Sequence, residues 1–459
     1  MKHLIFSLPV LIMSIFYSCK PQEAADLVIL NGKVLTIDTD NPLAEAIAVV
    51  DDKITDVGTN SRIRKLIDPE KTQIIDASGR LVIPGFNDAH VHFGPLDPDF
   101  IELRYTTDPS TITAKVKAQV AKSIPGELIR GGHWEHEMFI TREWPTKELI
   151  DKVSPDNPVV LARADGHSRL VNSYVLKKSG ITKNTPDPFG GEIQRDPVTG
   201  EPTGILKETA MDLINTGDVK TQRSPEDEAE KTWQGYLLAM KEARELGVTS
   251  VQNAGSEDFE AYEKLQKEGE LTCRIDIGKP LTGDTDILNK YKELSGKYPD
   301  SGDWIRFGYL KAFIDGSMGS GTALMFEPYN DEPSTSGLAM WNYDEFENMV
   351  LTADKMGFQI GVHAIGDKGN NWILNAFEKA QQVNGKRDSR HRDEHTQTLQ
   401  ASDIPRFAQL GVIPSMQPTH CISDKKFYEK RIGTERSKGA YAWRSLVDAG
   451  SVLAFGTDY

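Results

Sequence analysis

Short apolar runs separated by turn residues fill the stretch from residue 24 to residue 80. The runs that read as strands are Asp26–Leu30, Lys33–Thr36, Ala46–Val50, Ile54–Gly58 and Ile74–Ala77. Asn31-Gly32 follows the first run directly and favours a tight hairpin between the first two strands. The pattern predicts a small β domain over residues 24–80, which is too short to bury a large core by itself.

Beyond residue 79 the pattern changes, because strand-like apolar runs now alternate with helical periodicity. The clearest unit begins at Ser224, an N-cap residue that is followed by a proline and by acidic residues in the first turn. Apolar residues recur every three or four positions from Trp233 to Leu246, and Gly247 ends the helix before a strand at Val248–Val251. This alternation is typical of a parallel sheet with crossover helices.

Eight candidate strands in this part of the chain fit one (β/α)8 barrel of the TIM type. They are Val82–His92, Val248–Asn253, Arg274–Ile277, Ile305–Ile314, Gln359–His363, Arg392–His395, Val412–Met416 and Val452–Asp458. The gap between the first two is far too long for a βα loop, and it contains strand-like runs at Leu128–Arg130 and Val159–Ala162. We therefore predict an α/β protein whose barrel covers residues 81–459, with an inserted subdomain at about 93–227 over the barrel mouth. Because the chain stops directly after the eighth run, we expect a truncated sequence whose barrel is incomplete at the C-terminus.

The first residues have the form of an export signal. Lys2 precedes an apolar run from Leu4 to Tyr17, which is too short to span a membrane and fits the hydrophobic region of a signal peptide. Ser18-Cys19 at its end is typical of a bacterial lipoprotein signal, and an ordinary cleaved secretory signal is the alternative. We predict a lipoprotein-type signal over residues 1–19, with Cys19 as a lipid anchor and the only membrane contact. The expected location is the periplasm or the outer membrane.

Composition narrows the range of partners. The chain carries a net charge of −15 at pH 7 over 459 residues. This acidic balance argues against nucleic-acid binding, which usually requires a basic surface. Besides Cys19 the chain has Cys273 and Cys421, and both a disulfide between them and two free thiols are compatible with the sequence. The oligomeric state is not defined by the sequence.

Residues with metal-binding and catalytic side chains fall at the ends of the predicted barrel strands. They are His90 and His92 in the first strand, Lys311 in the fourth, His363 in the fifth, His395 in the sixth and Asp458 in the eighth. Asp88 alternates with His90 and His92, so these three side chains share one face of their strand. Because barrel enzymes carry their reactive groups at the C-terminal ends of the strands, we expect the set to meet at one site.

These motifs resemble those of the amidohydrolase superfamily of metal-dependent hydrolases, in particular the branch that contains N-substituted formamide deformylases. The matching stretches follow the family order from about residue 26 to the end of the chain. They are Pro84–His92, Gly166–Ser173, Thr199–Ile205, Lys311–Ser320, Val362–Asp367, Asp393–Gln397, Ser415–Pro418 and Leu453–Asp458. The first motif is shared by the whole superfamily, whereas the set together is specific to the branch.

The resemblance implies a metal site and a mechanism. His90, His92, His363 and His395 would bind one or two divalent metal ions, and zinc suits imidazole and carboxylate ligands. Asp458 would complete the metal site and act as the catalytic base, taking a proton from a metal-activated water and passing it to the departing nitrogen.

Lys311 corresponds to a lysine that is carboxylated and bridges two metals in binuclear members of the superfamily. A free ammonium group at this place would repel a metal, so the bridging role depends on carbamate formation. The alternative is a lysine that forms an ion pair, for example with Asp315. Arg392 and Glu394 flank His395, and we expect them to orient metal ligands.

Several residues outside the metal set are candidates for contact with substrate. The resemblance extends to His133 and Trp134 in the insert, and Trp134 offers an apolar wall, with packing inside the insert as the alternative. His167 would be a second catalytic residue that orients a carbonyl or stabilises the transition-state oxygen. His420 is a weaker substrate-binding candidate, and so is Glu208.

The sequence therefore predicts an exported, metal-dependent hydrolase that cleaves C–N bonds other than peptide bonds in a small-molecule amide, such as an N-substituted formamide or an acyl amide. Hydrolysis of a cyclic amide or an ester on the same fold is one alternative. A catalytically silent lipoprotein that binds a ligand or a partner is another. The presence of Asp458 argues against a silent protein, which has no need of a proton-shuttling carboxylate.

Overall fold

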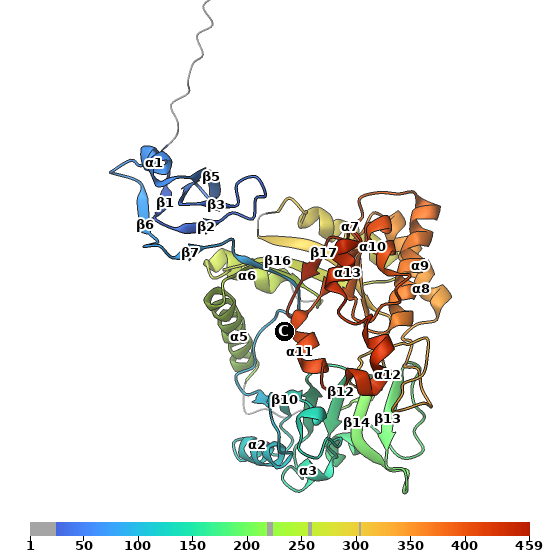
Figure 1. Ribbon diagram of the computed structural model, residues 1–459. Coiled ribbons are helices and arrows are strands. Elements are labelled where there is room, and N and C mark those ends of the chain that lie inside the picture. Colours follow the sequence, from blue (N-terminus) through green and yellow to red (C-terminus); the bar gives the residue numbers. More distant parts are fainter. Residues whose placement is uncertain (1–23, 218–223, 256–258, 303) are drawn as a thin grey trace, which may run out of the picture. The chain divides into compact units, whose positions relative to one another are not determined.

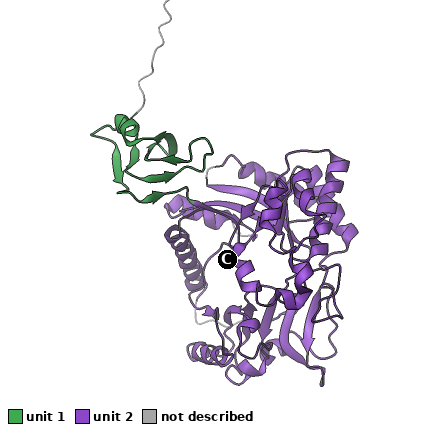
Figure 2. Cartoon of the chain, in the orientation of Figure 1, with its two compact units in different colours: residues 1–85 green, residues 86–459 purple. Residues whose placement is uncertain are grey.

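The computed structural model describes residues 24–217, 224–255, 259–302 and 304–459. The chain divides into two compact units, residues 1–85 and 86–459 (Figure 2). The predicted signal over residues 1–19, with Cys19, lies outside the described residues. In the described part of the chain, no helix is both long enough and apolar enough to cross a membrane.

The first unit contains two small sheets, with strand orders β5-β4-β1-β6 and β3-β2-β7 (Figure 1). The strands are β1 (Leu27–Leu30), β2 (Lys33–Leu35), β3 (Leu43–Ala44), β4 (Ala46–Val50), β5 (Lys53–Gly58), β6 (Gln73–Asp76) and β7 (Leu81–Val82). Helix α1 (Asn60–Ile63) and the 3-10 helix η1 (Arg64–Leu66) follow β5. Ile63 and Leu66 pack with Val28 of β1 in the small core of this unit.

The structure corrects two predictions in this region. β1 and β2 belong to different sheets, so the hairpin predicted at Asn31-Gly32 is wrong. Asn31 does adopt a turn conformation with φ 56°, but its N–H donates to Asn60 Oδ1 at 2.7 Å and the turn carries the chain from one sheet into the other. The predicted first barrel strand also began too early, because Leu81–Val82 pairs with β2 and Pro84 follows it before the barrel begins.

The second unit contains the predicted barrel. Its eight strands are parallel neighbours in the order β8-β15-β16-β17-β18-β19-β20-β21. They are β8 (Phe86–Val91), β15 (Val248–Asn253), β16 (Arg274–Pro280), β17 (Ile305–Phe313), β18 (Ile360–Ala364), β19 (Arg392–His395), β20 (Ile413–Met416) and β21 (Ala454–Phe455). Each predicted run overlaps one of these strands, which confirms the eight-stranded barrel.

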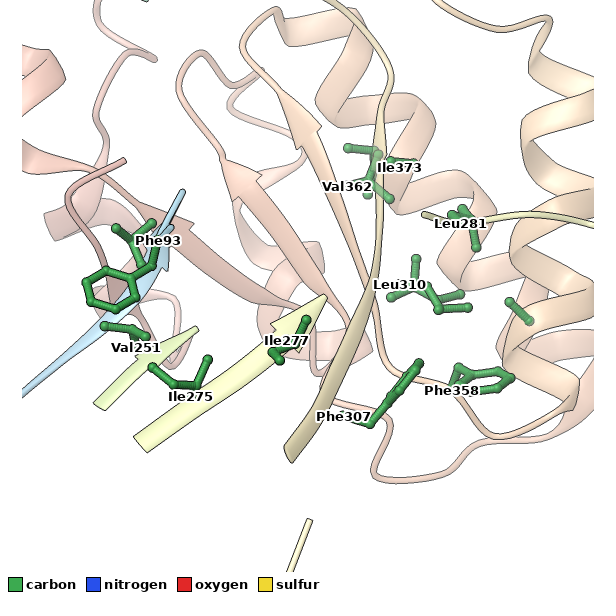
Figure 3. Packing of buried hydrophobic residues seen from close by; sticks show 14 of the residues in the cluster. Phe93, Val251, Ile275, Ile277, Leu281, Phe307, Leu310, Phe358, Val362 and Ile373 are labelled. Atoms are coloured by element: carbon green, nitrogen blue, oxygen red, sulfur yellow. The ribbon is translucent and has the colours of Figure 1, made fainter. Parts of the chain in front are cut away.

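Helices connect the strands of the barrel (Figure 1). They are α5 (Pro225–Glu245), α6 (Phe259–Glu268), α7 (Thr285–Lys297), α8 (Tyr343–Lys355), α9 (Asp367–Asn384), α10 (Ile404–Leu410), α11 (Pro418–Asp424), α12 (Tyr428–Ser437) and α13 (Trp443–Asp448). Ser224 caps α5 as predicted, since its side chain accepts the N–H of Asp227 in a reciprocal capping box. Between strands and helices the packing is apolar. Figure 3 shows Val362 of β18 beside Ile373 of α9, and both belong to one buried cluster.

The two described cysteines are free thiols, so the disulfide alternative is excluded. Cys273 is fully buried in the barrel cluster, whereas Cys421 lies on α11.

Hydrogen bonds join the residues after β21 to the first barrel strand. Asp458 N–H donates to His90 O at 2.8 Å, and His92 N–H donates to Tyr459 O at 2.9 Å. The Asp88 carboxylate accepts the backbone N–H of Thr457 at 2.9 Å and its hydroxyl at 2.6 Å. The first and eighth strands therefore meet, although 369 positions separate Asp88 from Thr457.

The predicted insertion between β8 and β15 forms a six-stranded sheet of its own, in the order β13-β14-β12-β11-β10-β9. Its elements are β9 (Ile101–Glu102), α2 (Ser110–Val120), β10 (Ile129–Trp134), η2 (His136–Met138), α3 (Glu148–Asp151), β11 (Val159–Arg163), β12 (Ser168–Val171), α4 (Ser173–Lys178), β13 (Gly191–Arg195), β14 (Pro202–Glu208) and η3 (Thr209–Leu213). β10 overlaps the strand expected at Leu128–Arg130, and β11 contains the one expected at Val159–Ala162.

Candidate active site

Asp458 lies at the centre of a group of imidazoles at the carboxyl ends of the barrel strands. Its Oδ1 is 3.3 Å from His90 Nε2 and 3.4 Å from His92 Nε2, and its Oδ2 is 3.6 Å from His420 Nε2. These separations exceed ordinary hydrogen bonds. They match the spacing of about 3.3–3.6 Å between ligand atoms that each lie about 2.0–2.2 Å from one tetrahedral metal. The possible ligand atoms form two sets, and within each set they all lie within 4.8 Å of one another. The sets are His90, His92 and Asp458, and His395, His420 and Asp458.

In three of the predicted ligands, a buried acceptor holds one ring nitrogen. The pairs are His90 Nδ1 with Glu394 Oε2 at 2.6 Å, His395 Nδ1 with Gln417 Oε1 at 2.6 Å and His363 Nε2 with the backbone carbonyl of Gly316 at 3.0 Å. An acceptor at one nitrogen fixes the tautomer, which leaves the lone pair of the other nitrogen for a metal. This arrangement is the one found around metal-binding histidines, and it fits a divalent metal at the predicted place.

The electrostatics of the site also fit a cation. Burial lowers the pKa of His395 well below the usual range, and the neighbouring His363 lowers it further. Burial has the same effect on the pKa of His363, and there His167 adds to it. Burial raises the pKa of the Asp458 carboxyl, but His90, His92 and His395 together outweigh burial and hold the pKa well below its ordinary value. Neutral imidazoles beside an ionised carboxylate are the protonation states that metal binding requires.

Lys311 is buried next to this donor set. Its Nζ lies 3.4 Å from His90 Nε2. Burial lowers the pKa of the Lys311 amine to about 8, although Glu394 and Asp458 raise it. Asp315, the alternative partner, accepts three backbone N–H groups instead. The position therefore keeps a partly neutral amine beside the metal ligands, and carbamate formation requires a neutral amine.

A cavity of about 410 Å³ lies between the barrel and the insert. Asp458 and His420 line it from the barrel, and His133 and His167 line it from the insert. His167 Nδ1 is 2.8 Å from Glu208 Oε2. Burial lowers the pKa of His167, but the carboxylates of Glu208, Asp165 and Asp458 together outweigh burial and raise the pKa to about 9. Glu208, a weak candidate in the sequence, thus positions the predicted catalytic histidine.

The two adjacent candidates His133 and Trp134 have different environments. His133 lines the cavity, with Nδ1 2.7 Å from Glu102 Oε2. Trp134 is fully buried in the core of the insert and donates its indole N–H to Leu161 O at 2.9 Å. Of the two alternatives for Trp134, packing inside the insert is therefore confirmed, and the apolar wall of the substrate site is not.

Four residues of the site have positive φ angles, a conformation that non-glycine residues rarely adopt. They are His133 at 64°, Glu208 at 50°, His395 at 76° and Asp458 at 58°. Such backbone strain costs about 1–3 kcal/mol per residue and is concentrated at functional sites. The positions of these side chains are therefore determined by the surrounding fold.

Glu394 orients a metal ligand, as expected, and that ligand is His90. Its carboxylate also contacts the guanidinium of Arg392, whose Nε lies 2.6 Å from Oε1. His395 is held by Gln417, a contact that was not predicted. The signal for Gln417 was its place in the matching stretch Ser415–Pro418.

A buried ion network on the insert side was also not predicted. Arg163 Nη2 donates to Glu135 Oε1 at 2.6 Å, and its Nη1 pairs with Asp165. Asp165 Oδ1 accepts the backbone N–H of His167 at 3.1 Å. The signal was the alternation of Arg163, Asp165 and His167 at two-residue spacing, the same pattern that drew attention to His90 and His92.

The fold and the donor set define a metal-dependent hydrolase built on an eight-stranded barrel. Residues 73–459 match the amidohydrolase family, and the chain belongs to that family. It is 35% identical over 450 residues to protein LONG AFTER FAR-RED 3 of Arabidopsis thaliana, and the match covers 95% of this chain and 75% of that protein. It is 26% identical over 459 residues to the N-substituted formamide deformylase of Arthrobacter pascens, covering 95% of this chain and 81% of that enzyme. The crystal structure of an uncharacterized metal-dependent hydrolase from Pyrococcus horikoshii matches with a TM-score of 0.68 at 26% identity, over 94% of this chain and 82% of that one.

Proposed function

We propose that this protein hydrolyses a C–N bond, other than a peptide bond, in a small-molecule amide such as an N-substituted formamide or an acyl amide. The observation that carries the proposal is the place of Asp458, which contacts His90 and His92 and also lines the cavity. Similarity to the formamide deformylase of Arthrobacter pascens supports the amide class. A cavity of about 410 Å³ suits a small molecule.

One or two divalent metal ions, for which zinc fits, would be held by His90, His92, His363, His395 and Asp458. Such a metal polarises a carbonyl oxygen and lowers the pKa of water. The ionised Asp458 accepts the proton of the attacking water and returns it to the departing nitrogen as the C–N bond breaks.

His167 acts from the opposite side of the cavity. Glu208 holds its Nδ1 at 2.8 Å, which leaves Nε2 free to donate a hydrogen bond to the carbonyl oxygen of the substrate. A donor placed before the reaction stabilises the negative charge that develops on that oxygen.

The Asp458→Asn variant tests this proposal. Wild type and variant are assayed by NMR with an N-substituted formamide, an acyl amide, a cyclic amide and an ester, and their metal content is measured by elemental mass spectrometry. We expect wild type to hydrolyse the linear amides and the variant to lose about 100- to 10,000-fold in rate, the usual contribution of a general base.

Undiminished hydrolysis by Asp458→Asn would overturn the mechanism. Turnover of the cyclic amide or the ester alone would move the substrate assignment to those compounds. Metal binding by wild type without turnover of any substrate would support the silent ligand-binding protein instead.

We also propose that the protein is exported and anchored through a lipid on Cys19. The positive charge of Lys2, the short apolar run from Leu4 to Tyr17 and Ser18-Cys19 at its end support this proposal. Mass spectrometry of the N-terminal peptide from the membrane fraction tests it. A lipid-modified Cys19 is expected, and an unmodified mature chain that begins at another residue would contradict the anchor.

A further inference from the structure

The two carboxylate oxygens of Asp458 face different groups of imidazoles. Oδ1 lies 3.3 and 3.4 Å from the Nε2 atoms of His90 and His92, whereas Oδ2 lies 3.6 Å from Nε2 of His420. A carboxylate that directs one oxygen toward each of two donor groups has the geometry of a bridging ligand. Two-metal hydrolytic sites place their ions about 3.5–4 Å apart, a distance that one carboxylate can span.

His420 is placed by the same segment that orients His395. It lies in α11, which begins directly after Gln417, and its backbone N–H donates to Gln417 O at 3.1 Å. The side chain of Gln417 holds His395 Nδ1 at 2.6 Å. The imidazoles of His395 and His420 lie nearly parallel, with ring centroids 5.8 Å apart and 18° between their planes. One short segment therefore sets the position of both rings relative to Asp458.

We infer that His420 is a metal ligand and that it forms, with His395 and Asp458, a second cation position beside the one made by His90, His92 and Asp458. The inference rests on the proposed metal-dependent function. The donor atoms of His395, His420 and Asp458 all lie within 4.8 Å of one another. Two imidazoles and a carboxylate are a donor set that zinc accepts while keeping a fourth position for water or substrate.

The surroundings of this second position differ from those of a closed structural site. The His420 side chain is 27% exposed and lines the cavity, so the position is open on the side from which a substrate arrives. Asp458 joins the two positions through its own carboxylate. A pair of ions here therefore does not depend on a carbamate at Lys311.

Metal stoichiometry separates this assignment from a role of His420 in substrate contact. The metal-free full chain is titrated with zinc against a competing chelator, and bound metal is counted by elemental mass spectrometry. We expect two zinc ions per chain in wild type. In His420→Ala we expect one, or a second ion bound at least tenfold more weakly, because a direct ligand has been removed.

His133→Ala is the matched control. His133 lines the same cavity, but it pairs with Glu102 at 2.7 Å and belongs to neither donor set. We expect this variant to bind zinc with the stoichiometry and affinity of wild type. Circular dichroism at the titration temperature verifies that both variants are folded.

Failure of this inference can be distinguished from failure of the proposed function. If His420→Ala keeps two ions at unchanged affinity, or if wild type binds one ion, the inference is overturned and the proposed hydrolase stands. If wild type binds no zinc and hydrolyses no amide, the proposed function itself fails.

A second experiment detects direct ligation by the appearance of a new signal, and not by the loss of metal binding. His420→Cys is made in a Cys421→Ser background, since Cys421 is adjacent, and the protein is loaded with Co²⁺. A cysteine thiolate bound to cobalt produces a sulfur-to-metal charge-transfer absorption. We expect this band in His420→Cys and not in His133→Cys in the same background. A folded, cobalt-loaded His420→Cys protein without the band contradicts ligation at this position.

Discussion

Glu394 Oε2 lies 2.6 Å from His90 Nδ1, although 304 positions of sequence separate the two residues. Both side chains are fully buried, and the second carboxylate oxygen of Glu394 lies 2.6 Å from Arg392 Nε. Glu394 therefore fixes the ring of one metal ligand and neutralises a buried guanidinium at the same time.

Glu394→Gln is expected to weaken zinc binding about 10- to 100-fold, because the histidine loses the carboxylate that orients it. It is also expected to lower the free energy of unfolding by about 3–5 kcal/mol, because the charge of Arg392 remains buried without its partner. Chelator competition and urea unfolding of the metal-free protein measure the two effects. Glu378→Gln is the control, since Glu378 is 46% exposed beside Arg406 and such pairs contribute at most about 1 kcal/mol. An unchanged zinc affinity in Glu394→Gln would contradict the assigned role.

Gly316 leaves room for the residue that holds His167. A Cβ atom there would lie 2.2 Å from Glu208 Oε1 and 2.2 Å from Thr322 Oγ1. Gly316→Ala must therefore displace Glu208, and we expect lower hydrolytic activity together with a loss of about 1–3 kcal/mol in stability. Steady-state kinetics and urea unfolding measure both.

Gly296→Ala provides the matched control in helix α7. A Cβ at this position meets no atom of the described residues within 4 Å. We expect unchanged activity and a gain of about 0.5–1 kcal/mol, since alanine replaces glycine inside a helix. Wild-type kinetics in Gly316→Ala would mean that the position of Glu208 has no bearing on the reaction.

His136 makes stability depend on pH. It stacks on Trp144 with ring centroids 4.2 Å apart and is 3% exposed. Burial first, and then Arg163 and Arg431, lower the His136 pKa from 6.5 to about 2. Because the folded pKa lies below the unfolded value, the unfolded state binds the proton first, and stability is lost as the pH falls below 6.5.

At pH 5 the free energy of unfolding is expected to be lower by about 2 kcal/mol, because each pH unit below 6.5 costs about 1.4 kcal/mol. Urea unfolding at pH 7 and pH 5 measures it in wild type and in His136→Gln, which lacks the titrating group. The drop in stability between the two pH values is expected to be smaller in the variant. Equal drops in the two proteins would show that His136 is not the responsible group.

Metal removal is expected to abolish hydrolysis and to lower the melting temperature, because the ligands of the folded state bind the ion and the unfolded chain does not. Zinc at 100 times its dissociation constant stabilises a single-site protein by about 2.7 kcal/mol. Calorimetry of the chelator-treated protein across a zinc series measures the effect, and activity is followed in the same samples. A melting temperature independent of zinc would contradict a metal site in the folded protein.

The barrel could be predicted from the sequence because strand-like segments alternate with helical periodicity beyond residue 79, the pattern of a parallel sheet with crossover helices. Val248–Asn253 and Arg392–His395 match the bounds of β15 and β19. The position of the donor residues at strand ends then followed from the general architecture of barrel enzymes.

The contacts that orient the ligands could not be predicted in the same way. The pairing of Glu394 with His90, and of Gln417 with His395, depends on which strands are neighbours and which way their side chains turn. The sequence left two alternatives open for Trp134 for a local reason, since the register of β10 shifts between Gly132 and Trp134 and a bulge changes which side chains face the cavity.

The joining of β8 to the segment after β21 has a consequence for synthesis. Asp88 can form its hydrogen bonds with Thr457 only after the intervening chain has been synthesised. At the usual rates of translation this synthesis takes roughly 20–75 s. Contacts between such distant segments also slow folding once the chain is complete. His90 and His92 are translated early but acquire the carboxylate of Asp458 only at the end, so the ion can be captured by the full donor set only after the eighth strand has emerged.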